Sequence, residues 1–434
     1  MLKITINNLL RLIISAYMIL IIIRYISRFK KASNVFINSY AFGHSIIETS
    51  AFFSSYGKKG ICISVGHKKN RNKYFKDLYK PNLLIHFWLP NIRPIQLYHA
   101  LRNRTHLIIS DLLRDSPITR VLLYVNLEIV DRDTVLDKTV LNHLVNNFSI
   151  SKQSALGLIN DFKNNYIKSS NKHSSSLAYL MQIKNLINFN LTPRLRDSNH
   201  VFFEKLRTLQ IEQLNGRPKV CTLIVRQSNK RWTGMGYKGY EEVISYLNEK
   251  KYIVNIIGDL KGWRKYKSRL NSMKVYDHVD YGLKAQLFQI LSVMNSNFCL
   301  GDLSGAQVIP HFFGKKNLIL NVIPTSQLQY NSLILPQIWK SNLGFVANVS
   351  MHFNLTFNRF KPLRLSNDEI YSPHFNDPVI ILDTVKHFVK IVENNESFYF
   401  NPYSNTRYDK SITKFALNSS ISPIFFRNFI FKSR

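Results

Sequence analysis

Short apolar runs alternate with amphipathic segments along most of this chain. Each run ends near turn-forming residues, which is typical of a buried β-strand. In the first half of the chain, the runs expected to form strands are residues 34–38, 61–65, 83–88, 105–110 and 122–130. Between the first two runs, apolar positions three and four residues apart predict a helix over residues 45–56. A strand, a helix and a strand in succession form the unit from which parallel sheets are built.

From about residue 131 to residue 213 the pattern becomes helical and polar, with helices expected over residues 149–160 and 174–186. A Gly/Pro turn at Leu214–Pro218 separates this part from a second region of clear strand–helix alternation. The strands expected there are residues 220–225, 253–257, 298–300 and 318–322, and the helices are residues 240–249, 284–294, 306–313 and 378–394.

The two regions predict an α/β protein with two Rossmann-like domains. The chain divides into an N-terminal membrane-anchor helix with a basic flank, an N-terminal domain with a helical insertion, a C-terminal domain, and a tail that packs back on the N-terminal domain. The expected ranges of these four parts are residues 1–31, 32–213, 214–385 and 386–434.

Residues 4–23 are mostly apolar, and residues 12–23 carry no charge. The uncharged part alone would span only ~18 Å of a ~30 Å hydrocarbon core, so crossing it needs the full stretch. Four basic residues follow between Arg24 and Lys31, and they favour a cytoplasmic position for the rest of the chain. We therefore expect a membrane anchor that spans the bilayer or lies in its interface. The alternative is a hydrophobic helix of the protein core.

The charge balance is strongly basic, with 59 Lys and Arg against 26 Asp and Glu and a formal net charge of +33. Such a surface attracts anionic lipid headgroups, phosphorylated substrates or nucleic acid. No zinc finger or RNA-recognition signature occurs, so nucleic acid is not an expected partner. The apolar content of 45% indicates folded globular domains.

The three cysteines, Cys62, Cys221 and Cys299, each lie inside an apolar strand-like run, where buried free thiols are usual. An odd number of cysteines without a Cys-x-x-Cys pair excludes a disulfide framework and argues against a cysteine zinc site. We expect both domains to occupy a reducing compartment.

Phosphate-compatible groups follow three expected strands of the second region. They are Arg226, Gly258, Asp259, Asp302, Ser304, Gly305 and Gln307. An arginine holds a diphosphate through two hydrogen bonds, and a helix start supplies unpaired N–H groups. Ser304 is placed to cap that helix, and either aspartate bonds a sugar hydroxyl or acts as a turn residue. Neither G-x-G-x-x-G nor a P-loop motif occurs, so the interpretation depends on the three strand ends together.

His44 and Glu48 lie at the turn after the first strand and are candidate general bases. A turn histidine is more often structural, and His86 and His311, in apolar surroundings, are expected to be core or lining residues. No H-E-x-x-H, D-x-D or similar cluster occurs, so no metal or other cofactor is expected.

Several blocks of the chain resemble a family of GT-B-type glycosyltransferases encoded with bacterial surface-polysaccharide (O-antigen or capsule) genes. The similar blocks are Phe42–Glu48, Val220–Arg226, Tyr240–Asp259, Val279–Tyr281 and Cys299–Pro324, of which the last is the most specific. They are scattered between about residue 36 and residue 324.

The resemblance implies two facing Rossmann-like domains, the second holding a nucleotide-sugar donor and the first contacting the acceptor. It implies metal-independent transfer, because Arg, hydroxyl groups and helix N-termini stabilise the leaving diphosphate. A lipid-linked acceptor at the membrane surface fits the apolar N-terminus and the basic charge. Two alternatives stay open. One is a transferase of a pyruvyl, phosphoryl or other activated group to polysaccharide, and the other is a non-catalytic scaffold of a polysaccharide assembly complex.

Overall fold

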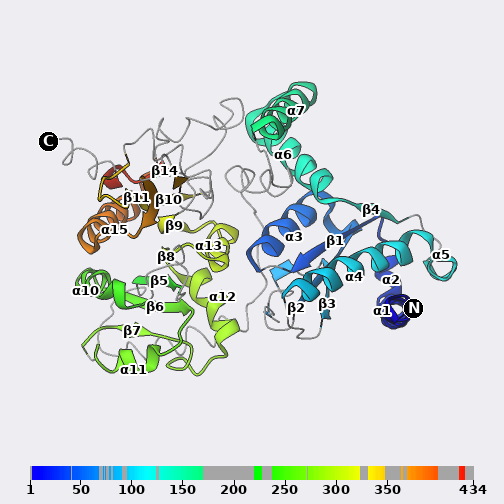
Figure 1. Ribbon diagram of the computed structural model, residues 1–434, viewed down its shortest axis with the longest axis horizontal. Coiled ribbons are helices and arrows are strands. Elements are labelled where there is room, and N and C mark those ends of the chain that lie inside the picture. The colour runs from blue at the N-terminus through cyan, green and yellow to red at the C-terminus, as the bar shows by residue number, and fades with distance from the viewer. Residues whose placement is uncertain are drawn as a thin grey trace. The chain divides into compact units, whose positions relative to one another are not determined.

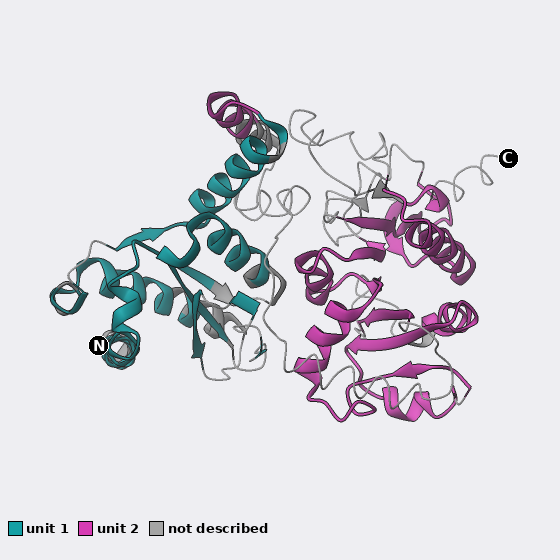
Figure 2. Cartoon of the chain, turned by 180° about the vertical axis from the view of Figure 1, so that it is seen from behind, with its two compact units in different colours: residues 1–149, 191–195 teal, residues 150–190, 196–434 magenta. Residues whose placement is uncertain are grey.

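The chain forms two compact units, the first from residues 1–149 and 191–195 and the second from residues 150–190 and 196–434 (Figure 1, Figure 2). The computed structural model describes residues 2–40, 42–67, 72, 74, 78–79, 82–89, 95–123, 127–169, 219–226, 237–270, 272–322, 331–347, 363–364, 369–398 and 420–425. Each unit has its own parallel sheet, which confirms the predicted α/β class. The predicted boundary at Leu214–Pro218 lies outside the described residues and stays a prediction.

The sheet of unit 1 has four parallel strands in the order β3–β2–β1–β4. These are β1 (Asn34–Tyr40), β2 (Gly60–His67), β3 (Leu83–Leu89) and β4 (Glu128–Val130). β2 pairs along all of β1, whereas β4 pairs only with residues 34–36. From Ile37 onward, the edge of β1 on the β4 side therefore has no strand partner within the described ranges.

Helices cover both faces of the unit 1 sheet. They are α1 (Leu2–Arg24), α2 (Ile26–Phe29), α3 (Phe42–Tyr56), α4 (Ile95–Asp115), α5 (Pro117–Leu123) and α6 (Arg132–Phe148), with a 3-10 turn at Gly57–Lys59. α1 and α4 pack on the face that carries Ile37 and Val65. Successive strand residues point to opposite faces. Phe36 therefore lies on the α3 side, where its ring stacks on Phe52 with centroids 5.4 Å apart.

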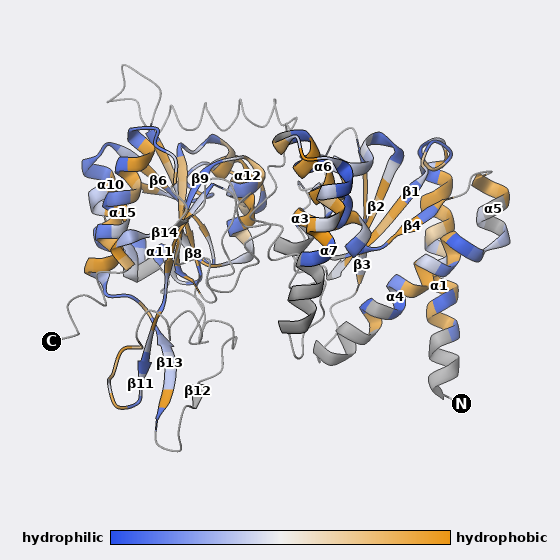
Figure 3. Ribbon diagram, turned by 90° about the horizontal axis from the view of Figure 1, so that it is seen from above, coloured by the Kyte–Doolittle hydropathy of each residue, from blue (hydrophilic) through white to orange (hydrophobic). Residues whose placement is uncertain are grey.

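The sheet of unit 2 has seven parallel strands in the order β14–β10–β9–β8–β5–β6–β7. They are β5 (Lys219–Val225), β6 (Tyr252–Gly258), β7 (Val275–Tyr276), β8 (Phe298–Asp302), β9 (Lys316–Val322), β10 (Ser332–Pro336) and β14 (Ser420–Ile421). The central strands are buried along almost their whole length, as expected for a parallel sheet with both faces covered. Figure 3 shows that strands of both parallel sheets are mainly hydrophobic.

The helices assigned to unit 2 are α7 (Lys152–Ser169), α10 (Glu241–Glu249), α11 (Trp263–Lys267), α12 (Ala285–Asn295), α13 (Val308–Phe312) and α15 (Pro378–Glu393), with 3-10 turns η4 (Tyr237–Tyr240) and η5 (Gly305–Gln307). A small antiparallel sheet joins β11 (Ile338–Ser341), β13 (Ile370–His374) and β12 (Leu363–Arg364). Leu247 of α10 and Phe388 of α15 belong to one hydrophobic core with the strands of the large sheet.

Both parallel sheets reverse their direction of growth at one point. In unit 2 the chain adds β6 and β7 on one side of β5, and then adds β8, β9 and β10 on the other. In unit 1 it adds β2 and β3 on one side of β1, and β4 on the other. The crevice outside the carboxyl ends of the strands at such a switch point is where open α/β sheets bind ligands. The two candidate positions are therefore the β5/β8 and β1/β4 strand ends.

Two expected elements differ in the structure. Residues 105–110 lie inside α4 and not in a strand, because Thr105, Ile109 and Leu113 recur every four residues and bury one helical face. The run at residues 122–130 divides between the end of α5 and the short β4. The two-residue β7 was not predicted from the sequence.

The tail also differs from expectation where it is described. Residues 420–425 were expected to pack on the N-terminal domain, but Ser420 and Ile421 form β14, which pairs with β10. Phe425 is fully buried in the hydrophobic core of unit 2. Two hydrogen-bonded residues leave little periodicity to detect, so the sequence pattern does not reveal this strand.

The apolar N-terminal stretch folds as the single helix α1. Among the described residues, no helix has both the length and the hydropathy required to cross a membrane. The inner side of α1 joins the core of unit 1 through Ile14, Met18 and Ile22. The expected position of both domains on the cytoplasmic face stays a prediction.

Candidate functional site

At the switch point of unit 2, a buried carboxylate holds two strand ends together. Asp302, the last residue of β8, is fully buried. Its Oδ2 accepts a hydrogen bond of 2.9 Å from the backbone N–H of Arg226, directly after β5. Its Oδ1 accepts a bond of 2.6 Å from the hydroxyl of Tyr240. Both oxygens are thus occupied, so Asp302 organises the crevice.

The tyrosine that completes this network comes from η4, outside the three predicted strand ends. Burial raises the pKa of the Tyr240 hydroxyl well above its ordinary value, and the charge of Asp302 raises it further. The hydroxyl therefore stays protonated and donates a hydrogen bond to the carboxylate. A donor bonded to an ionised carboxylate gives a stronger hydrogen bond than a neutral pair.

The turn after β8 begins with the predicted serine cap. The Ser304 hydroxyl accepts from the backbone N–H of Ala306 at 3.2 Å, which confirms Ser304 as the cap of η5. The expected continuous helix at residues 306–313 is instead the three-residue η5 followed by the short α13. Gln307 is fully buried, and its Nε2 donates to the carbonyl of Asp302 at 3.1 Å. The Gln307 side chain therefore stabilises the turn from inside the protein and does not face a ligand.

Two glycines allow the neighbouring strands to approach β5 closely. Gly258 has φ of +109° and Gly301 has φ of +138°, a region that L side chains rarely adopt. A Cβ at Gly258 would lie 2.1 Å from the Val225 carbonyl oxygen, and one at Gly301 would lie 2.0 Å from that of Ile224. Side chains are thus excluded at both flanks of β5.

The remaining predicted groups of this cluster reach the surface. Asp259 is exposed, its backbone N–H donates to the Val225 carbonyl at 3.0 Å, and its carboxylate accepts from the N–H of Lys261 at 3.4 Å. Arg226 is half-buried, and its Nη1 donates to the Leu303 carbonyl at 3.4 Å. The structure therefore brings Arg226, Ser304 and Gly305 to the carboxyl ends of β5 and β8. Asp302 and Gln307 are buried beneath them and hold the turn in place.

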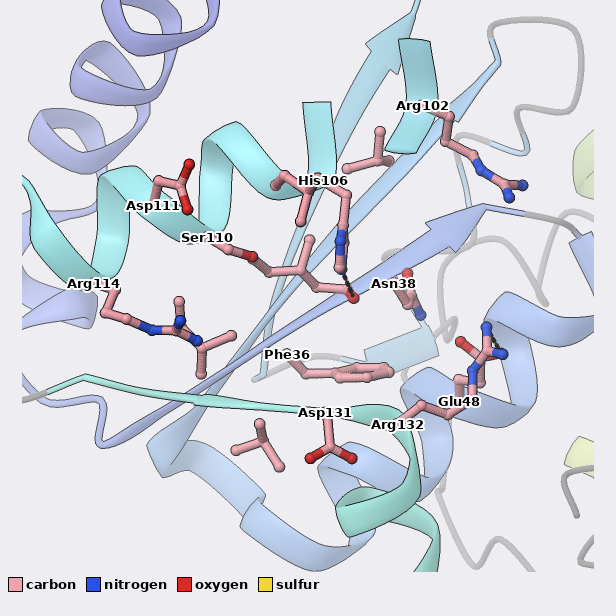
Figure 4. Close-up of a pocket in the computed structure, with 15 residues that line it drawn as sticks. Phe36, Asn38, Glu48, Arg102, His106, Ser110, Asp111, Arg114, Asp131 and Arg132 are labelled. Carbon is pink, nitrogen blue, oxygen red and sulfur yellow. Dashed lines mark hydrogen bonds and ion pairs between the residues drawn. The ribbon is translucent and has the colours of Figure 1, made fainter. Parts of the chain in front are cut away.

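A cavity of about 520 Å³ lies at the other switch point, in unit 1 (Figure 4). It opens where β4 stops and the edge of β1 continues unpaired, so Phe36, Ile37 and Asn38 form one side of it. Its charged and polar lining also includes Glu48, Arg102, His106, Ser110, Asp111, Arg114, Asp131 and Arg132. Guanidinium, carboxylate and imidazole groups in one lining suit a polar ligand.

Glu48, one of the two predicted bases, belongs to this cavity. Its side chain is 1% exposed, and its Oε1 forms an ion pair of 2.9 Å with Nη2 of Arg132, the first residue of α6. Nearby, Asp131 caps α6 by accepting from the N–H of Thr134 at 2.8 Å. The other predicted base, His44, lies in the first turn of α3, and its side chain is outside the described part of the chain.

α4 contributes a polar stripe that the sequence analysis missed. Arg102, His106, Ser110 and Arg114 recur every four residues and line the same cavity. Nε2 of His106 donates to the Ile37 carbonyl on the open edge of β1, at 3.0 Å. Burial lowers the pKa of His106, and the charges of Arg102 and Arg132 lower it further against the effect of this hydrogen bond. The four-residue period would have revealed the stripe had the segment been read as a helix.

The cysteines and the two remaining candidate histidines lie in the protein interior or pack against an aromatic ring. All three cysteines are free and buried, as predicted, and burial raises the pKa of Cys299 to about 12. His311 is fully buried, and His86 stacks on Trp88 with ring centroids 4.8 Å apart. No group of three or more His, Cys, Asp or Glu residues that could hold a metal ion occurs in the described part of the chain. Metal independence stays a prediction.

Comparison with known proteins gives matches only at the level of structure. No family model and no curated protein matches the chain. The chain is similar to a family 9 glycosyl transferase from Veillonella parvula, with 9% identity and a TM-score of 0.44 over 84% of this chain and 98% of the other. It is similar to E. coli ADP-heptose LPS heptosyltransferase II, with 11% identity and a TM-score of 0.37 over 69% and 89%.

A third similar structure is the E. coli heptosyltransferase WaaC with ADP-2-deoxy-2-fluoro heptose, with 8% identity and a TM-score of 0.37 over 69% of this chain and 92% of the other. All of these TM-scores are below 0.5. The function proposed below therefore rests on the residues of this chain.

Proposed function

We propose that this chain is a glycosyltransferase that moves a sugar from a nucleotide-sugar donor to a surface-polysaccharide acceptor. The observation that carries the proposal is the strand order of unit 2. Arg226 and the Ser304 turn follow the two strands, β5 and β8, between which the sheet reverses direction. That crevice is the usual nucleotide position of a doubly wound sheet. The sequence resemblance of Cys299–Pro324 supports the same assignment.

The donor would be held by complementary charge and by backbone approach. The Arg226 guanidinium would pair with the diphosphate, and the exposed Gly305, which has no side chain, would let the diphosphate approach the backbone of the turn. Exposed Asp259 is the candidate for a ribose hydroxyl. Arginine compensates the charge that develops on a leaving diphosphate, so this site would need no metal.

The acceptor sugar would occupy the cavity of unit 1. In the transfer, the acceptor hydroxyl oxygen bonds to the anomeric carbon of the sugar while the bond from that carbon to the diphosphate breaks. The nucleoside diphosphate leaves with the electron pair, and a base takes the hydroxyl proton. Glu48 and His44 are the candidate bases, and Arg132 would position Glu48.

The test is ligand-dependent stability of the purified full chain. We expect one nucleoside diphosphate of a panel to raise the melting temperature. At a concentration of 100 times its Kd, the ligand should stabilise the folded chain by about 2.7 kcal/mol. Arg226→Ala should abolish the shift, whereas Arg269→Ala, an exposed arginine beyond α11, should keep it. Stabilisation by none of the panel, or an unchanged shift in Arg226→Ala, would remove this site.

Turnover separates the proposal from its alternatives. A glycosyltransferase releases a nucleoside diphosphate only when a nucleotide sugar is supplied with an acceptor. Turnover with another activated donor alone would identify a different transferase. Polysaccharide production that survives Arg226→Ala would favour a scaffold.

A further inference from the structure

We infer that the outward face of α1 lies in the interface of an anionic lipid bilayer while its inward face stays in the core of unit 1. The inward residues are Ile14, Met18, Ile21 and Ile22, all buried in the core that α1 shares with α4. Met18 and Ile22 are completely inaccessible to solvent. α1 is therefore an integral part of unit 1, and its opposite side is the one that faces the surroundings.

That opposite side is apolar. Its large exposed side chains are Leu9, Leu12, Ile13, Leu20 and Ile23, with exposures from 52% to 68%. Tyr17 is 46% exposed and lies at the border of this side, where its ring packs edge-on against Phe87 of β3 with centroids 5.0 Å apart. The spacings of three and four residues among these side chains of α1 place them on one face of a helix with 3.6 residues per turn. From Leu9 to Ile23 the stripe is about 21 Å long at 1.5 Å per residue. A contiguous apolar stripe of this kind marks an interaction surface.

The charges around the stripe identify the partner. Arg24, Arg28, Lys30 and Lys31 are exposed at and just beyond its carboxyl end. The first acidic residue of the chain is Glu48, and it is buried. On the α4 side of the helix, the exposed carboxylate of Asp111 lies 3.9 Å from Arg11. The surface is thus apolar along its length and cationic at its carboxyl end, which complements acyl chains below anionic headgroups.

A protein partner fits this surface less well. Lysine is depleted from protein–protein interfaces, whereas basic residues beside an apolar helical face are the usual composition of helices that lie in the membrane plane. A second copy of this chain would bring the same cations together. The inference does not depend on the proposed activity, because it concerns no donor or acceptor.

The test is co-sedimentation of the full chain with vesicles. We expect binding to vesicles of 70% phosphatidylcholine and 30% phosphatidylglycerol, and at least tenfold weaker binding to pure phosphatidylcholine. Leu12→Gln/Leu20→Gln should weaken binding to the anionic vesicles at least tenfold. Leu156→Gln/Leu343→Gln, which changes two exposed leucines elsewhere, should leave binding unchanged.

A charge pair of variants tests the other half of the surface. Arg28→Gln/Lys31→Gln should weaken binding severalfold, and Lys265→Gln/Arg269→Gln, on the exposed surface of unit 2, should not. All these side chains are exposed, so melting temperatures should match the wild type. Equal binding of the wild type and Leu12→Gln/Leu20→Gln would overturn the inference. So would failure of the wild type to bind, or a wild-type dimer that this leucine variant converts to a monomer.

Discussion

The two switch points share a topology, but the ends of their strands are finished in different ways. In unit 2 the buried carboxylate of Asp302 accepts two uncharged donors and ties β5 to β8. In unit 1 β4 stops after three residues, and a cavity of about 520 Å³ opens beside β1. Strand ends that are linked by hydrogen bonds form a rigid surface on which a ligand can bind. A strand edge without a partner leaves a cavity that a ligand can enter.

The charges follow the same division. At the switch point of unit 2, the carboxylate of Asp302 accepts from two uncharged donors and stabilises the framework. The buried carboxylate of unit 1, Glu48, is paired with a guanidinium that is 32% exposed at the cavity. Doubly wound topology therefore fixes where a site lies, whereas the strand lengths and the partner of the buried acid decide what kind of site it is.

The largest effect should come from filling the close approach of β8 to β5. Gly301→Ala would place a Cβ 2.0 Å from the Ile224 carbonyl oxygen at a φ of +138°. Backbone strain and overpacking together should cost about 4 kcal/mol of unfolding free energy in urea denaturation. Gly314→Ala has a φ of +62° and open space, so it should cost only about 1 kcal/mol. Similar losses for both would mean that the strand ends are not closely tied.

Removal of the tie itself should have the next largest effect. Asp302→Ala leaves the Tyr240 hydroxyl and the Arg226 N–H without their acceptor, which should cost about 3 kcal/mol of unfolding free energy. The exposed neighbour supplies the control, since Asp259→Ala should change stability by less than about 0.5 kcal/mol. A loss below about 1 kcal/mol for Asp302→Ala would contradict the role assigned to this carboxylate.

The matching change in unit 1 should be milder. Arg132→Ala strands the charge of Glu48, and because the arginine is one-third exposed we expect a loss of about 2 kcal/mol. Glu48→Gln/Arg132→Ala should recover much of it, since no buried charge is left unpaired. Arg11→Ala, which breaks an exposed pair of 3.9 Å, should cost almost nothing. If the double variant is no more stable than Arg132→Ala, the pair is not energetically coupled.

The smallest effect should be a pH dependence at the open edge of β1. The pKa of His106 is lower in the folded chain than its ordinary value of 6.5, so the unfolded chain binds more protons below that pH. The unfolding free energy should therefore fall as the pH drops below about 6.5, and His106→Gln should reduce this slope. His143 also has a lowered pKa through burial, so part of the slope should remain. An unchanged slope in His106→Gln would show that this histidine is not the titrating group.

Sequence periodicity identified most of the framework because the buried strands are continuous apolar runs. The strands β5, β6, β8 and β9 and the Ser304 cap followed from local composition alone. α4 was misread because its central segment is apolar enough to imitate a strand, and the stripe containing His106 was lost with it. Tyr240 could not be found, since 62 residues separate it from the carboxylate it bonds and only the fold brings them together.

The two-sidedness of α1 bears on how this protein should be produced. Trimming a hydrophobic leader is the common route to better expression, yet loss of residues 2–24 would remove Met18 and Ile22 from the interior and leave a hole beside the sheet. Polar replacements at Leu12 and Leu20 would improve handling in water without that damage. A detergent also needs to cover only one apolar face of a helix, and not the whole circumference of a membrane-spanning segment.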